Sequence, residues 1–184
     1  MSHYFLAVPL PGEVRAHLLD SAQTFKQHLQ YGYWTDEADY HITLLFLGEA
    51  QSSQIDALKE CLHDRTKALQ GSHISLKGFG TFGKKEQPRV LWMGIEHDRH
   101  LTDLYSAVRD CVGANGFEVE KRPYRPHITI AKKWRGPSSI SAEQWHSFVP
   151  TFEPFSWKAN EFRLYKVEPA KTPRYIPIEH FPLI

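Results

Sequence analysis

The sequence HITLLFLG occupies residues 41–48, and the similar sequence HITIAKKW occupies residues 127–134. Both are typical of buried strands, because they are rich in apolar and β-branched residues. Side chains alternate along a strand, so each histidine and the threonine two residues later should share one face. The apolar residues between them should anchor the other face in a core. Each stretch therefore predicts a rigid strand that presents one imidazole and one hydroxyl together.

The two histidine strands occupy the same place in a repeated pattern. In both halves of the chain an apolar strand begins 37 residues before the histidine, at Tyr4 and at Val90, and one amphipathic helix lies between. Each histidine strand is followed by a helix and later by a Pro-Arg step before a further strand, at residues 88–89 and 173–174. This consistent order indicates a duplicated α+β unit.

The repeat predicts an α+β fold with two similar lobes that face each other. We expect one domain over residues 1–184 with two lobes, roughly 1–89 and 90–184, and leave strand exchange between the lobes open. Gly78, Gly80 and Gly83 should form a loose connection. Strands are expected at residues 4–10, 40–47, 72–77, 90–95, 127–131, 155–158, 161–167 and 175–181, and helices near 14–29, 53–69, 101–112 and 141–148.

The composition is that of a folded protein with almost no net charge. Of 184 residues, 41% are apolar, and 22 Lys and Arg are balanced by 21 Asp and Glu. A protein that binds nucleic acid mainly through bulk charge is thereby excluded. The N-terminus lacks the features of a signal peptide, and no apolar run approaches the length of a membrane span. We therefore expect a cytoplasmic protein with no membrane association and no obligate protein partner.

Neither the cysteines nor the histidines show the spacing of a disulfide scaffold or a metal site. Cys61 and Cys111 fall in predicted helices, so no disulfide is expected, and each is interpreted as a small buried apolar residue. No HExxH motif is present. His97 and His100 could ligate a metal from one helical turn, but their charged neighbours favour a solvated helix start. We therefore expect neither a metal nor another cofactor.

The pattern His-apolar-Ser/Thr-apolar occurs more often than chance predicts. About 0.2 matches are expected at random for this composition, whereas three are present. The third, at His73, lacks the upstream strand and helix and is interpreted as an ordinary strand start. The repeat singles out His41 and His127, although each could instead be a core histidine hydrogen-bonded to its neighbours.

Two imidazoles and two hydroxyls in one cleft suit displacement at phosphorus. Histidine titrates at about pH 6.5, so one ring can take a proton from an attacking water while the other protonates the leaving oxygen. The hydroxyls of Thr43 and Thr129 can hold the non-bridging oxygens as charge builds. Six cations between Lys121 and Arg135 favour an anionic substrate, although a solvated basic loop would have the same composition.

With these features the chain resembles the 2H phosphoesterases. The resemblance rests on HITLLFLG at residues 41–48 and RPHITIAK at residues 125–132, and it covers nearly the whole chain. Within that superfamily the chain is similar to the bacterial and archaeal RNA 2′,3′-cyclic phosphodiesterases, once named 2′-5′ RNA ligases. The resemblance implies a bilobal α+β fold with pseudo-twofold symmetry, in which two antiparallel sheets face a central cleft and the helices lie outside. It also implies metal-independent hydrolysis of RNA 2′,3′-cyclic phosphate ends to 2′-phosphates, with RNA ends or cyclic nucleotides as binding partners.

The resemblance also implies a role for each site residue. His41 would be the proton donor to the 3′ leaving oxygen, and His127 would be the proton acceptor that activates water. The residues implied in substrate binding are Thr43, Thr129, Lys132, Phe46 and Arg125. The family often has arginine where this chain has Lys132, and lysine keeps the charge but loses the bidentate fork.

Two other functions stay open at this point. The basic segment, together with lysine at position 132, also fits a module that binds RNA ends without turnover. A related 2H esterase that acts on 2′-5′ linkages or on ADP-ribose cyclic phosphates would carry the same motifs. A comparison of these substrates in one assay would separate the alternatives.

Overall fold

The computed structural model describes residues 2–84, 87–136, 140–151 and 153–184. Its helices are α1 (Gly12–Lys26), α2 (Ser52–Thr66), α3 (Arg99–Ala114) and α4 (Ala142–Phe148), with a short 3-10 helix at Glu37–Asp39. Its strands are β1 (Ser2–Pro9), β2 (Tyr31–Trp34), β3 (His41–Ala50), β4 (Ser72–Lys84), β5 (Gln87–Ile95), β6 (His127–Trp134), β7 (Ser156–Ala159), β8 (Glu161–Val167) and β9 (Tyr175–Pro182). The predicted α+β class is confirmed.

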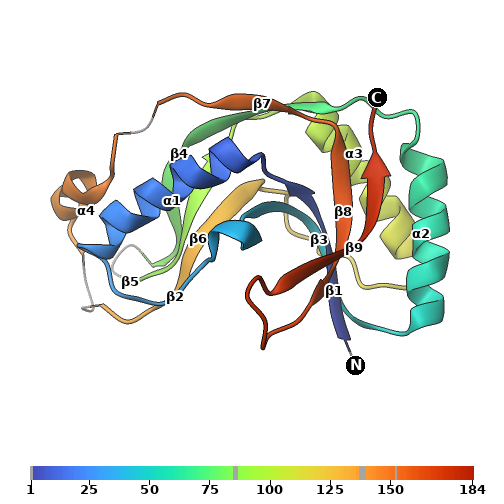
Figure 1. The fold of residues 1–184 in the computed structure, drawn as a ribbon, viewed down its shortest axis with the longest axis horizontal. Coiled ribbons are helices and arrows are strands. Elements are labelled where there is room, and N and C mark those ends of the chain that lie inside the picture. Colours follow the sequence, from blue (N-terminus) through green and yellow to red (C-terminus); the bar gives the residue numbers. More distant parts are fainter. Residues whose placement is uncertain (1, 85–86, 137–139, 152) are drawn as a thin grey trace.

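The strands pair antiparallel and form one curled sheet in the order β7-β4-β5-β6-β3-β1-β8-β9, with β2 also paired to β6. The two sheets implied by the family resemblance are joined where β3 meets β6, through the residue pair Ile42–Ile128. Strand β4, from the first half of the chain, pairs with β5, and β8, from the second half, pairs with β1. Figure 1 shows β4, β5 and β6 on one side and β1, β8 and β9 on the other.

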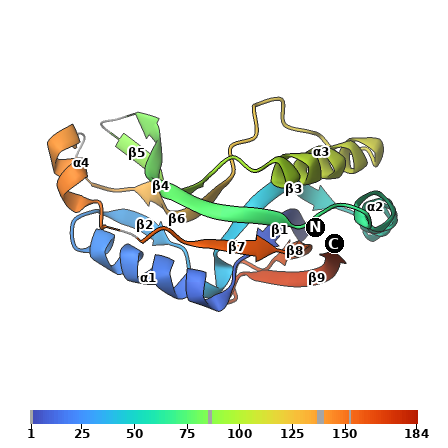
Figure 2. The ribbon, with the colours of Figure 1, turned by 90° about the horizontal axis from the view of Figure 1, so that it is seen from above.

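Helices cover both groups of strands from outside. Helix α1 lies over the β4–β6 side, and α2 and α3 lie side by side at the other end of the molecule (Figures 1 and 2). The apolar stripe of α1 explains its position, because Val14, Leu18 and Phe25 are fully buried. No helix within the described segments combines the length and the apolar character needed to span a bilayer.

The two faces of the histidine strands differ as the alternation predicts. The apolar residues of their outer face belong to the main core: Ile42, Leu44, Ile128 and Ile130. A smaller apolar cluster lies on the opposite face, beside His41, and consists of Phe5, Ala7 and Tyr165. The apolar face of each strand is therefore fixed by the core, and its histidine face points away from that core.

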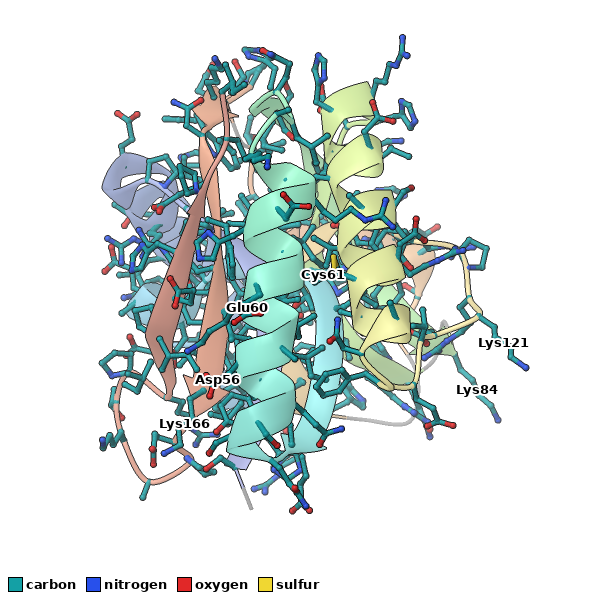
Figure 3. All side chains as sticks on the ribbon, turned by 90° about the vertical axis from the view of Figure 1, so that its right-hand side faces the viewer. Asp56, Glu60, Cys61, Lys84, Lys121 and Lys166 are labelled. Carbon is teal, nitrogen blue, oxygen red and sulfur yellow. A yellow bond between two sulfur atoms is a disulfide. The ribbon has the colours of Figure 1, made fainter. Side chains whose placement is uncertain are left out.

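The expectation that the cysteines are unpaired is wrong. Cys61 of α2 and Cys111 of α3 form a disulfide, with their Cα atoms 5.8 Å apart (Figure 3). The two helices pack side by side and bring these positions together, although 50 residues separate them in sequence. Sequence spacing alone carries no sign of such a pairing, because the contact depends on how the helices pack.

The structure also corrects the region after residue 77. Strand β4 continues through Gly78, Gly80 and Gly83 to Lys84, so these glycines belong to a long strand rather than a loose connection. A Cβ at Gly80 would lie 2.4 Å from the ring of Trp92, so the glycine allows the two strands to pack closely around that indole. The sequence reading also missed β2, a four-residue strand that contains Gly32.

Candidate active site

The structure brings the two histidine motifs together on one face of the sheet. His41 begins β3 and His127 begins β6, and the antiparallel pair Ile42–Ile128 sits between the motifs. This register sets His41 beside Thr129, and it sets Thr43 beside His127. The four polar side chains therefore form a compact square, with the apolar residues between them pointing to the core behind.

Both imidazole rings are oriented by the same main-chain contact. Nδ1 of His41 donates to the carbonyl oxygen of Asp39 at 2.7 Å, and Nδ1 of His127 donates to the carbonyl oxygen of Arg125 at 2.7 Å. A proton on Nδ1 leaves the lone pair of a neutral ring on Nε2. Thr43 Oγ1 lies 2.9 Å from Nε2 of His41 and donates to it in this tautomer. Nε2 is thus the atom through which each ring can exchange a proton with a ligand.

Aromatic side chains enclose the two rings. Around His41, the ring of Phe5 lies 4.8 Å away, and the ring of Tyr175 meets it edge-on at 5.1 Å. Around His127, the ring of Phe82 packs edge-on at 4.9 Å. These contacts fix the ring planes and remove water from their faces, so electrostatic interactions at the two histidines act in a medium of reduced polarity.

This environment lowers the pKa of both histidines. Burial lowers the pKa of His41 to about 4, the hydrogen bond to Asp39 opposes the shift, and the positive charges of His127 and Lys132 add to it. Burial also lowers the pKa of His127, against the hydrogen bond to the Arg125 carbonyl. Both rings are therefore neutral at pH 7 in the free protein, and each can accept a proton at Nε2.

A bulge follows the threonine in each histidine strand. Along β3, Thr43 pairs with Ala7 of β1 and Leu45 pairs with Leu6, so Leu44 has no partner of its own. The extra residue shifts the alternation by one. Phe46, five residues after His41, consequently returns to the histidine face. Its side chain is 69% exposed there, with its ring 5.9 Å from that of Phe5.

The second strand has the same irregularity. Along β6, Thr129 pairs with Trp92 of β5 and Ala131 pairs with Leu91, which leaves Ile130 as the extra residue. Lys132, five residues after His127, therefore also returns to the histidine face. Without the bulge it would point away from the histidines, because an odd offset along a regular strand changes face.

Lys132 meets a second cation that the sequence reading did not select. Nζ of Lys132 lies 4.9 Å from the ring centre of Tyr33, and the guanidinium carbon of Arg174 lies 4.5 Å from the same ring. Burial lowers the pKa of Lys132, and Lys133 and Arg174 add to the effect. The repeated Pro-Arg step was the available signal for Arg174, since it marked the same position in both halves of the chain.

A buried carboxylate holds Arg174 in place. Asp39, which is 2% exposed, accepts hydrogen bonds from the backbone amides of Arg174 at 2.9 Å and Tyr175 at 3.1 Å. The carbonyl of Asp39 also orients His41. One residue thus links the first histidine, the second cation and an aromatic wall of the site.

The side chains of the remaining predicted residues make no described contact with the two histidines. Arg125 has an exposed side chain, and its described contact with the site is made by its carbonyl oxygen. His97 lies before α3, and His100 lies in its first turn. Within the described ranges, no group of three or more His, Cys, Asp or Glu residues is arranged to hold a metal ion.

Comparison with known proteins identifies similar sequences and structures. The sequence model described as the 2′-5′ RNA ligase superfamily matches residues 11–170. The RNA 2′,3′-cyclic phosphodiesterase of Bacillus subtilis is 34% identical over 183 residues, which cover 98% of this chain and 96% of that protein. The protein of the same name from Geobacillus stearothermophilus is 35% identical over 183 residues, and this chain spans 58% of its length.

Solved structures show the same arrangement. The crystal structure of E. coli LigT complexed with 3′-AMP aligns with a TM-score of 0.76 and 25% sequence identity, over 99% of this chain and 98% of that one. The structure of TT0787 from Thermus thermophilus aligns with the same TM-score and identity, over 98% of this chain and 97% of the other. The curled sheet and its four helices are therefore shared across nearly the full length.

Proposed function

The chain belongs to the 2′-5′ RNA ligase superfamily, and from this premise we propose that it hydrolyses the 2′,3′-cyclic phosphate at an RNA end to a 2′-phosphate without a metal ion. The observation that carries the proposal is the antiparallel pairing of two HxT motifs on one face, with each Nδ1 bound to a main-chain carbonyl so that Nε2 is the atom left for proton transfer. Relatives named RNA 2′,3′-cyclic phosphodiesterase support the substrate class. The proposal includes a cytoplasmic location, with which the names of the relatives are consistent.

In the proposed reaction, water attacks the phosphorus on the His127 side. Nε2 of His127 takes a proton from the water as the new P–O bond forms. The P–O3′ bond breaks on the opposite side, and Nε2 of His41 gives its proton to the leaving 3′ oxygen. The product keeps its phosphate on the 2′ oxygen, and exchange with solvent returns each ring to its starting state. The assignment of donor and acceptor follows the family.

The other side chains of the face hold the phosphate. Once His41 is protonated at Nε2, the Thr43 hydroxyl no longer donates to that ring, so the hydroxyls of Thr43 and Thr129 can donate to the non-bridging oxygens. Lys132 and Arg174 supply positive charge to the same oxygens. The anionic substrate also favours protonated His41 by charge attraction, so the pKa of this ring rises when substrate binds. Phe46 offers an exposed aromatic surface on which a base can stack.

The direct test is an assay of one enzyme preparation against three substrates. These are an RNA oligonucleotide with a 2′,3′-cyclic phosphate, a 2′-5′-linked dinucleotide and an ADP-ribose cyclic phosphate. We expect turnover of the first, with a 2′-phosphate product identified by ³¹P NMR and an unchanged rate in EDTA. Loss of activity in EDTA that zinc restores would contradict the metal-free mechanism. Tight binding of the first substrate without product over hours would instead support an RNA-end binding module.

The pH dependence of kcat/KM should show a maximum on the acid side of neutrality. The productive form needs His41 protonated and His127 neutral. Because the pKa of His41 in the free protein is about 4, its protonated fraction falls as the pH rises above that value. The pKa of His127 is also lowered, so this ring becomes protonated only under acidic conditions. Since kcat/KM reports the free enzyme, a profile measured from pH 4 to pH 9 should decline toward alkaline pH. A rate that rises through pH 7 to an alkaline plateau would exclude His41 as the proton donor.

A further inference from the structure

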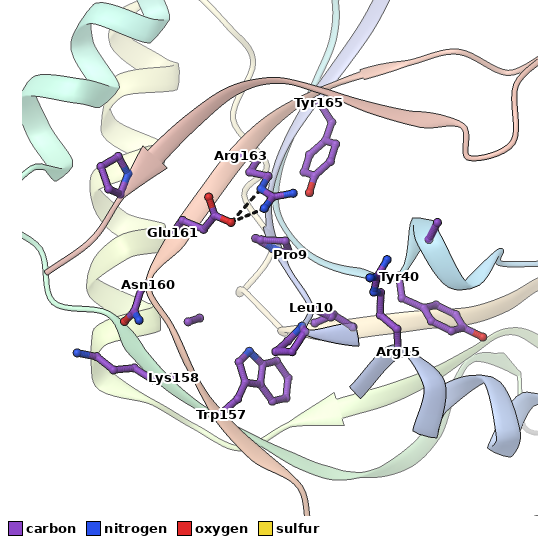
Figure 4. Close-up of a pocket in the computed structure, with 14 residues that line it drawn as sticks. Pro9, Leu10, Arg15, Tyr40, Trp157, Lys158, Asn160, Glu161, Arg163 and Tyr165 are labelled. Atoms are coloured by element: carbon purple, nitrogen blue, oxygen red, sulfur yellow. Dashed lines mark hydrogen bonds and ion pairs between the residues drawn. The ribbon is translucent and has the colours of Figure 1, made fainter. Parts of the chain in front are cut away.

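A cavity of about 550 Å³ lies beside the candidate active site, between the start of α1 and strand β8 (Figure 4). Pro9, which lines it, is the strand partner of His41, and Tyr40, also in its lining, immediately precedes His41. The ring of Tyr165 projects into the same region, with its centre 6.4 Å from that of the His41 ring. The cavity therefore adjoins the His41 side of the site rather than the His127 side.

The register of the sheet explains why polar groups of β8 reach this space. Tyr165 pairs with Phe5 and Arg163 pairs with Ala7, whereas Ala7 and Pro9 pair on the other edge of β1 with Thr43 and His41. The side chains of Tyr165 and Arg163 consequently lie on the histidine face of the sheet.

The lining of the cavity carries a net positive charge. Three cations contribute to it, Arg15, Lys158 and Arg163, against one carboxylate, Glu161. Glu161 accepts a hydrogen bond from Nε of Arg163 at 3.1 Å and another from His180 at 3.1 Å. Burial raises the pKa of Tyr165, and the charges of Arg163 and Arg15 oppose that shift, so both guanidinium groups act on the tyrosine hydroxyl.

Hydrogen-bond donors in the lining lack acceptors. Within the described residues Arg15 forms no ion pair, and its buried Nε has no hydrogen-bond partner. The indole nitrogen of Trp157, a side chain that is 8% exposed, is likewise buried without a partner. Both groups can only donate, and an unsatisfied buried donor costs free energy. A ligand rich in acceptor oxygens would supply the missing partners.

The geometry of in-line displacement determines which part of the RNA substrate lies near this cavity. The leaving 3′ oxygen belongs to the terminal ribose and departs on the His41 side, opposite to the attacking water. The ribose and the rest of the RNA therefore extend from His41, in the direction of Tyr165 and Arg163. The next anionic group along that chain is the phosphodiester between the last two nucleotides.

We propose that this cavity binds the phosphodiester that joins the last two nucleotides of the RNA, with Arg15 and Arg163 as its cationic ligands and the Tyr165 hydroxyl as a further donor. The inference rests on the proposed function and narrows it. The natural substrate is an oligonucleotide end, and a cyclic mononucleotide, which has no such phosphodiester, fills only part of the site.

The test compares cytidine 2′,3′-cyclic phosphate with a dinucleotide that ends in the same cyclic phosphate. Wild-type enzyme should have the higher kcat/KM on the dinucleotide. Arg15→Gln should reduce the ratio of the two kcat/KM values about tenfold, mainly through KM, because one charge-assisted contact is lost. We choose Arg15 rather than Arg163 for this test, because replacing Arg163 would also leave Glu161 without one of its partners, whereas Arg15 pairs with no carboxylate in the described residues. Arg65→Gln, on the exposed surface of α2, is the matched control and should keep the wild-type ratio.

Replacing the internal phosphodiester with a neutral methylphosphonate of similar shape tests whether the negative charge of this group is needed for binding. This change should weaken binding of the 2′-phosphate dinucleotide product to wild-type enzyme and have little effect on binding to Arg15→Gln. A parallel loss on both cyclic substrates in Arg15→Gln, or equal wild-type binding of phosphodiester and methylphosphonate, would overturn the inference while leaving the proposed function intact. Absence of turnover on both substrates would instead contradict the proposed function, and the binding comparison would still decide whether the cavity recognises the phosphodiester.

Discussion

Replacement of His127 by alanine should lower kcat/KM for an RNA 2′,3′-cyclic phosphate by about 10²- to 10⁴-fold, and His41→Ala should have an effect of similar size. His127→Ala removes the Nε2 atom that would accept the proton of water, and His41→Ala removes the group that would protonate the leaving oxygen. Each ring lies at the start of a strand whose next residue is fully buried, so the truncation removes chemistry and leaves the packing behind the strand. Steady-state kinetics with circular dichroism of each variant measures both properties.

The chain supplies a matched control for these variants. His73 begins the third copy of the pattern, but its side chain is exposed on β4, which is separated from β6 by β5 in the sheet. His73→Ala should therefore keep the wild-type rate. Wild-type turnover by either His41→Ala or His127→Ala, in a variant that remains folded, would remove the basis of the paired-histidine mechanism.

The position of the two histidines could be predicted because it depends on local pattern. An apolar strand with alternating polar residues fixes which side chains share a face, and the structure places His41 and Thr43 accordingly. The helix ends also follow local rules: Ser141 accepts a hydrogen bond from the amide of Gln144, and Gly116 has a positive φ of 77°. The internal duplication stays a prediction.

Features that depend on tertiary packing could not be predicted in this way. The bulges at Leu44 and Ile130 reverse the alternation after each threonine, so a regular-strand reading would put Phe46 and Lys132 on the wrong face. Arg174 reaches the site on a segment whose backbone is bound by the buried carboxylate of Asp39, a contact between residues far apart in the sequence. The disulfide arises in the same way, from the packing of two helices, and leaves no mark in the spacing of the cysteines.

The second large effect is expected at Lys132. Lys132→Met should lower kcat/KM about 10²-fold, because it removes a partly buried charge that faces the developing negative charge on the phosphate. It should also raise the pKa of His41, since the positive charge of Lys132 contributes to lowering it. His41 acts in its protonated form, so the alkaline decline of kcat/KM should move to higher pH. A purely structural role for Lys132 would leave that decline where it is in the wild type.

Lys132→Arg tests whether charge or geometry matters at this position. If the charge suffices, this variant should recover most of the rate lost in Lys132→Met, because Arg174 already supplies a guanidinium against the same Tyr33 ring. Lys121→Met, on the exposed surface of the same basic segment, should keep both the rate and the pH profile (Figure 3). A loss at Lys121 as large as that at Lys132 would mean that the segment acts through its total charge. A selective loss at Lys132 would show that the bulge in β6 places one particular cation against the phosphate.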